Sequence, residues 1–99
     1  MKVDTRFEDD TLVVTVEGRL SLDNAPKLEA AIEPEIGMAQ NMVFDFADLV
    51  FISSAGLRTI LSCQKRMMAK GGAVTVRNAN RSVRDIFTVT GFNRSVTVE

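Results

Sequence analysis

The sequence has no histidine and only one cysteine among its 99 residues. Without histidine, a Ser-His-Asp triad, a Cys-His pair and a histidine metal site are excluded. The lone Cys63 allows neither an internal disulfide nor a CxxC zinc site, which favours a reducing compartment, so we expect a cytoplasmic protein. The six glycines form no GxxxxGKS/T or GxGxxG motif, so the usual phosphate-binding loops are missing. We therefore predict a protein that is not an enzyme and has no catalytic residue, cofactor or metal.

Long apolar runs and an excess of positive charge are also missing. The net charge of −1 and the pI of about 5.4 argue against nucleic acid as a partner. Apolar runs extend for only a few residues, whereas a helix needs about 20 to cross a bilayer, so we expect no membrane insertion. The N-terminal MKVDTRFEDD is too acidic for a signal peptide. The hydrophobic fraction of 45% is enough for one core, and residues 1–99 are predicted to form one domain.

Changes of hydrophobic period along the chain predict its elements. Residues 11–17, TLVVTVE, alternate with period two and place Leu12, Val14 and Val16 on one face of a strand. The preceding KVDTRF is expected to pair with this strand as a hairpin.

The next segment changes to a helical period. Asp23 and Asn24 are suitable helix caps, and Pro26 suits the first turn. Pro34 is expected to end or kink this helix near Glu33.

The second half of the chain alternates between strands and helices. Residues 41–52 are rich in β-branched and aromatic side chains and predict one interior strand. A helix beginning near Ser54 shows an apolar stripe made of Leu57, Ile60, Leu61 and Met68. A strand AVTVRN, a short helix NRSVRDIFTVTGF and a possible last strand SVTVE follow. This order predicts an α/β fold with a mixed sheet of about four to five strands and helices packed mainly on it.

The stretch FISSAGLRTIL, residues 51–61, places two serines before Ala55-Gly56 at a strand–helix junction. Ser53 or Ser54 can cap the helix, which is worth about 1 kcal/mol. Gly56 in the first turn costs roughly 0.5–1 kcal/mol relative to alanine, and either close packing on the sheet or the approach of another molecule would account for it. The fold would tolerate a phosphate here, because free N–H groups and the positive end of the helix dipole lie nearby. A partner docked over the same helix start would be repelled by it.

Three segments together resemble the STAS family, named for sulfate transporters and anti-sigma-factor antagonists: VEGRLSLDNAPKLE, VFDFADLVFISSAGLRTIL and RSVRDIFTVTGF. The resemblance covers essentially the whole chain, and the family's fold agrees with the element order above. A stand-alone domain of this length is most similar to the bacterial antagonists. The resemblance implies a partner-switching protein that binds an anti-sigma factor with serine kinase activity. Phosphorylation by that kinase releases it, and a serine phosphatase reverses the modification.

The resemblance also implies a site. Aligned on Gly56-Leu57, the family's phosphorylated serine falls on Ser54, and Ser53 is the competing acceptor. The implied partner-binding residues are Ser21, Asp23, Asn24, Ser53, Ser54, Ala55, Gly56, Leu57 and Arg58.

The motif departs from its sporulation-type members at two positions. Those members carry aspartates where this chain has Ser53 and Ser21, although Asp23 lies two residues from the second position. These differences affect recognition by a sporulation-type kinase and leave the acceptor serine in place.

A second interpretation belongs to another class of protein. Small STAS proteins can be cytoplasmic accessory subunits of bacterial lipid-transport complexes, where they dock on an ATPase subunit and need no phosphorylation. Recovery of a transporter ATPase in a pull-down, with no kinase-type anti-sigma factor, would favour this interpretation.

Overall fold

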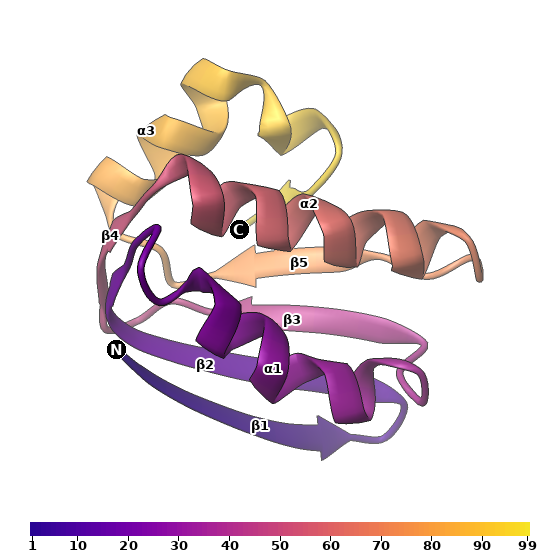
Figure 1. Ribbon diagram of the computed structural model, residues 1–99. Coiled ribbons are helices and arrows are strands. Elements are labelled where there is room, and N and C mark those ends of the chain that lie inside the picture. Colours follow the sequence, from indigo (N-terminus) through magenta and orange to yellow (C-terminus); the bar gives the residue numbers. More distant parts are fainter.

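Six strands form a mixed sheet in the computed structural model, which describes residues 1–99 (Figure 1). The strands are β1 (Lys2–Glu8), β2 (Thr11–Leu20), β3 (Asn41–Asp45), β4 (Leu49–Ile52), β5 (Val74–Arg77) and β6 (Thr97–Val98). The helices are α1 (Ala25–Ile36), α2 (Ser54–Met68) and α3 (Arg81–Thr90), followed by the 3-10 turn η1 (Phe92–Arg94). The predicted α/β fold, with a mixed sheet and helices packed on it, is confirmed.

The strand order places four strand ends at one edge of the sheet. β1 and β2 form the expected antiparallel hairpin. The sheet continues in the order β1-β2-β3-β5-β6 with parallel pairs, and β4 pairs in parallel with the last residues of β2. The carboxyl ends of β2, β3, β4 and β5 therefore meet at one edge, on the left of Figure 1, where α2 also begins.

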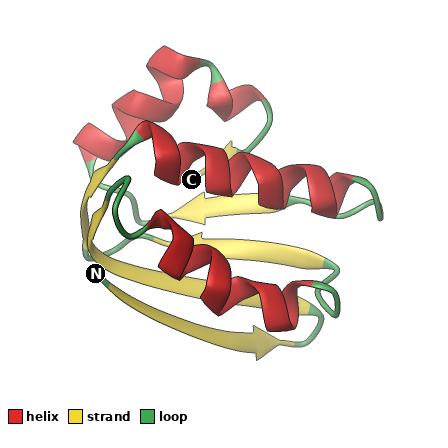
Figure 2. Ribbon diagram, in the orientation of Figure 1, coloured by secondary structure: helices red, strands yellow, loops and turns green.

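One face of the sheet carries α1 and α2 (Figures 1 and 2). The side chains predicted to face inward from β2, Leu12, Val14 and Val16, are all fully buried there. They belong to a core of 24 buried residues, of which Phe44 and Phe87 are among the largest. This core fixes the helices on the sheet and thereby the position of the first turn of α2.

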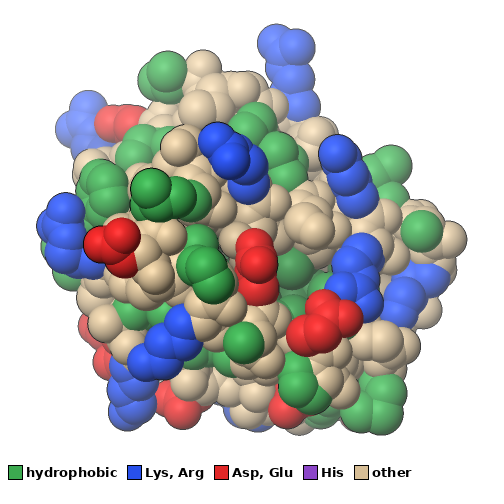
Figure 3. Space-filling model, viewed as in Figure 1, with side chains coloured by type: hydrophobic (Ala, Val, Ile, Leu, Met, Phe, Trp, Pro, Cys, Tyr) green, Lys and Arg blue, Asp and Glu red, His purple; other side chains and the backbone are tan.

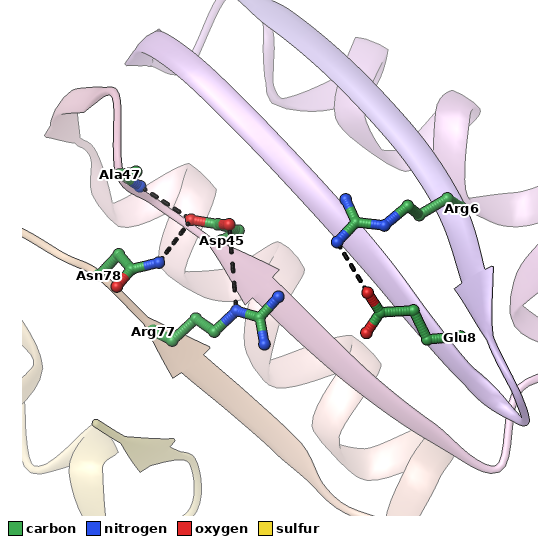
Figure 4. A network of polar contacts seen from close by, with 6 residues as sticks. All are labelled: Arg6, Glu8, Asp45, Ala47, Arg77 and Asn78. Atoms are coloured by element: carbon green, nitrogen blue, oxygen red, sulfur yellow. Dashed lines mark hydrogen bonds and ion pairs between the residues drawn. The ribbon is translucent and has the colours of Figure 1, made fainter.

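The opposite face of the sheet carries polar side chains (Figure 4). Asp45 at the end of β3 accepts a hydrogen bond of 3.2 Å from the Asn78 side chain, and its carboxylate lies 3.9 Å from Arg77 Nε. Arg6 and Glu8 form a separate ion pair at 2.9 Å on β1. The contacts of Asp45 with Arg77 and Asn78 join the ends of β3 and β5.

The single strand predicted for residues 41–52 is wrong, because these residues form two strands. The Asp45 carboxylate accepts the Ala47 N–H at 3.1 Å, and the Leu49 N–H donates to the Phe46 carbonyl at 3.1 Å, so residues 46–48 make a turn. This turn carries the chain from β3, which pairs with β2 and β5, to β4, which pairs with β2 alone. Because β3 and β4 are both rich in apolar residues, the composition of residues 41–52 does not reveal the turn between them.

The two main helices also differ from expectation, α1 in where it ends and α2 in which methionine it buries. α1 does not end at Glu33 but continues through Pro34 to Ile36, because a proline in the last turn removes only one backbone donor while Ile36 is buried. In α2, Met67 is fully buried and Met68 is 63% exposed, so the predicted stripe is rotated. The side of α2 that carries Cys63 faces α1. Its residues are small or polar, so a search for large apolar residues does not detect this contact.

Candidate functional site

The loop after β2 and the start of α2 lie side by side at the carboxyl edge of the sheet. Leu20 and Ile52 are register partners at the ends of β2 and β4. The Ser53 N–H then donates to the Leu20 carbonyl at 2.8 Å. The loop residues 21–24 therefore emerge next to the two serines.

Ser53 is the N-cap of α2. Its backbone is extended, with φ −92° and ψ 172°, and its Oγ accepts the Gly56 N–H at 3.3 Å. The Ser53 carbonyl also accepts the Leu57 N–H at 3.0 Å. The choice of cap that the sequence left open is thus settled in favour of Ser53.

Ser54 is the first residue of the helix and its side chain is exposed. Its hydroxyl makes no hydrogen bond within the chain, in contrast to that of Ser53. The backbone N–H groups of Ser54 and Ala55 have no acceptor in the chain, as expected for the first turn of a helix. A free hydroxyl and two free backbone donors therefore share this surface.

Gly56 is required by packing against the sheet. A Cβ at this position would lie 2.7 Å from Leu20 Cγ and 2.9 Å from Ile52 Cγ1. Both neighbours are buried, so a larger residue would displace either the core or the helix start. The glycine thus lets α2 begin directly on the ends of β2 and β4, which places Ser54 at the edge of the sheet.

Asn24 shapes the neighbouring loop. Its Oδ1 accepts the Ser21 N–H at 2.8 Å, and its Nδ2 donates to the Arg19 carbonyl at 2.8 Å. It occupies the N-cap position of α1 but makes no side-chain cap bond, because both ends of its amide are used within the loop. The two hydrogen bonds of Asn24 therefore fix the conformation of the loop, which holds Ser21 and Asp23 beside the start of α2.

The predicted partner-binding residues divide by exposure. Asp23, Ser54 and Arg58 are exposed. Ser21, Asn24, Ser53 and Ala55 are half-buried, while Gly56 and Leu57 are buried. The buried pair can influence a partner only by positioning the turn.

Three exposed apolar residues flank the site and were missed from the sequence. Leu22 is 73% exposed in the loop, and Val50 and Phe51 of β4 are 61% and 36% exposed. The Arg19 guanidinium lies 4.5 Å from the centre of the Phe51 ring. Hydrophobic side chains gather accordingly over the starts of α1 and α2, at the left of Figure 3. An apolar residue inside a polar loop, Leu22, was the one available signal.

A cavity of about 180 Å³ lies between α1 and α2, away from the two serines. The ion pair of Arg66 with Glu33, at 2.9 Å, forms part of its lining. Cys63 also lines it, and burial raises the pKa of this thiol to about 11, so the thiolate is scarce at neutral pH.

No group of three carboxylates or thiols is arranged to hold a metal ion. None of the helices combines the length and the apolar character that crossing a bilayer requires.

Comparisons with known proteins point to one family. The model of the STAS domain matches residues 2–99. BtrV of Bordetella bronchiseptica, a candidate anti-sigma factor antagonist by name, is 30% identical over 93 residues, which are 93% of this chain and 80% of BtrV.

Solved structures share the fold. A candidate anti-sigma factor antagonist from Thermotoga maritima superposes with a TM-score of 0.89 at 19% identity, over 97% of this chain and 84% of its own. The Bacillus cell fate determinant SpoIIAA in its phosphorylated form gives a TM-score of 0.78 at 20% identity, over 99% of this chain and 91% of its own.

Proposed function

Because this chain belongs to the STAS domain family, we propose that it is an anti-sigma-factor antagonist that acts by partner switching. In this proposal the unphosphorylated protein binds an anti-sigma factor that is also a serine kinase. The kinase transfers the γ-phosphoryl group of ATP to Ser54 Oγ, whose proton is lost as the bond to ADP breaks. The antagonist is then released, and a serine phosphatase hydrolyses the phosphate. The protein acts by binding, in the cytoplasm, and catalyses no reaction itself.

The observation that carries the proposal is the different state of the two serine hydroxyls. Ser53 Oγ is held by the Gly56 N–H and is half-buried, whereas Ser54 Oγ is exposed and free. A kinase can therefore reach Ser54 without breaking the cap of α2. This supports Ser54 over Ser53 as the acceptor.

The position of Ser54 also separates the effect on binding from the effect on folding. Phosphorylation adds about −1.5 to −2 charges at the surface. The helix end stabilises such a charge by about 0.3–1 kcal/mol, so the fold should persist. A partner covering the same turn would have to desolvate the phosphate or face it with its own charges, which costs several kcal/mol.

The exposed apolar residues supply a reason for the partner to bind here. Leu22 in the loop after β2 and Val50 and Phe51 of β4 are exposed on the two segments that lead to the start of α2, and burying such side chains on association is favourable. We assign them to the docking surface together with Asp23, Ser54 and Arg58. An acceptor serine inside an apolar docking surface is what a phosphorylation-controlled interface needs.

Incubation with the cognate kinase and ATP, followed by mass spectrometry of the peptide that contains both serines, tests the proposal. We expect one phosphate, on Ser54, and none on the Ser54→Ala protein, which should still bind the kinase. Ser53→Ala is the matched control and should remain a substrate. Phosphate on Ser53 would refute the assignment, and recovery of a transport ATPase as the partner would refute the function.

A further inference from the structure

Ser54 and Arg58 lie one turn apart on α2. Residues four apart on a helix are neighbours on its surface, with Cβ atoms about 6 Å apart. Both side chains are exposed. An arginine side chain is long enough to span this separation, so its guanidinium can reach a phosphate carried by Ser54.

Arg58 is free to make this contact. Arg66, farther along the same helix, is paired with Glu33 of α1, and Arg81 lies 4.0 Å from Asp85. Arg58 has no acidic partner within 4.0 Å and makes no side-chain hydrogen bond. Glu29 of α1, which faces the first half of α2, instead accepts a hydrogen bond from Thr59 at 3.0 Å. Basic side chains stand over α2 in Figure 3. Arg58 belongs to this helix, and its charge is unpaired.

We propose that Arg58 binds the phosphate of phosphorylated Ser54 within the same chain and is thereby withdrawn from the partner surface. This inference rests on the proposed function, in which Ser54 is the phosphorylated residue. The guanidinium presents parallel N–H donors that match two oxygens of a phosphate. In the unphosphorylated protein Arg58 offers the partner an exposed cation, and in the phosphorylated protein that cation is engaged. One phosphorylation would thus change two features of the docking surface.

The elements beside the start of α2 carry further charges, among them Arg19 at the end of β2, Asp23 in the following loop and Glu29 of α1. The Arg19 guanidinium lies over the Phe51 ring. None of these residues changes between the variants below, so their effects on the phosphate cancel in the comparison.

Phosphorus NMR of protein in which phosphoserine is incorporated at position 54 during translation tests the pairing without any kinase. The second pKa of phosphoserine is ordinarily about 6. An exposed ion pair should lower it by about 0.2–0.7 unit. We therefore expect a pKa lower by that amount in the otherwise unchanged protein than in Arg58→Gln, with the difference shrinking in about 1 M salt.

Lys65→Gln is the matched control. It removes the same charge from the same side of α2, eleven residues from Ser54, and Lys65 is also exposed without an ion-pair partner. We expect Lys65→Gln to leave the pKa of the phosphate unchanged. Arg58→Lys keeps the charge but loses the parallel N–H donors of the guanidinium, so the pKa should lie between those of the unchanged protein and Arg58→Gln.

Equal pKa values in the unchanged protein and Arg58→Gln would overturn the pairing, and so would an equal rise in Lys65→Gln. Because the phosphate is installed by translation, these results do not depend on the kinase. A kinase that modifies another residue would refute the proposed function and leave the measured pairing as it stands.

Discussion

The two ends of the helical layer differ in how their backbone groups are satisfied. At the end where α1 and α2 finish, Lys70 Nζ donates to the carbonyls of Gly37 and Ala39 at 3.2 and 2.7 Å, and Gln40 Nε2 donates to the Lys70 carbonyl at 3.0 Å. At the end where α2 begins, the N–H groups of Ser54 and Ala55 have no acceptor in the chain.

Apolar exposure does not distinguish the two ends, since Met38 and Met68 are exposed at the first and Leu22 at the second. The difference lies in polar groups. One end is closed by contacts within the chain, whereas the other keeps a hydroxyl and backbone donors available. A closed end serves stability and an open end leaves room for regulation, so substitutions at the two ends should have separable effects.

The largest expected effect on stability is at the closed end. A Cβ at Gly72 would lie 1.7 Å from the Gln40 carbonyl oxygen, a backbone atom that cannot move without disturbing the loop. Gly72→Ala should therefore lower the free energy of unfolding by about 3 kcal/mol, measured by urea denaturation. Gly37→Ala is the control, because a Cβ there has no neighbour within 4 Å, and its stability should be unchanged or slightly raised. Equal stabilities for the two variants would show that this end is not tightly closed.

A large effect on binding is expected at the open end. Phe51→Ala should weaken the affinity for the anti-sigma factor by about tenfold to a hundredfold, because the exposed ring belongs to the proposed docking surface. Phe7→Ala is a matched control, since Phe7 on β1 is 38% exposed and Phe51 is 36% exposed. Isothermal titration calorimetry would measure both. If Phe7→Ala weakened binding as much as Phe51→Ala, the partner would not be confined to the edge near Ser54.

The smallest effect concerns Cys63, which lies between the two ends in the helix interface. Burial raises the pKa of its thiol from 9.0 to about 11, so the folded protein holds this proton more tightly than the unfolded chain. The resulting stabilisation is complete below about pH 9 and is lost as the pH rises toward 11. Alkylation at pH 8 should accordingly be slow in the folded protein and fast in urea. Rapid alkylation of the folded protein would mean that the interface between α1 and α2 opens readily.

The element order could be predicted from the sequence because the hairpin and the starts of the helices have local causes. Leu12, Val14 and Val16 alternate along β2, Pro26 lies in the first turn of α1, and Asn80 caps α3 through the Val83 N–H at 2.9 Å. Such signals are contained within a few residues. They place the elements without fixing how the elements contact one another.

The composition of the candidate site depended on contacts that are distant in sequence. Residues 41–52 read as one strand because the turn at 46–48 is fixed by Asp45 and by the change of partner from β3 to β4. That change leaves Val50 and Phe51 exposed, which no local pattern indicates. The place where α2 starts is likewise fixed by a distant contact, the hydrogen bond from the Ser53 N–H to the Leu20 carbonyl.

A paired measurement on protein with and without phosphate on Ser54 tests the central claim most directly. Affinity for the anti-sigma factor and the free energy of unfolding would be determined on the same two samples. We expect the phosphate to weaken binding by at least about a hundredfold and to change the free energy of unfolding by less than about 1 kcal/mol. Undiminished binding by the phosphorylated protein, or loss of binding only because the chain unfolds, would contradict a switch that acts at the surface.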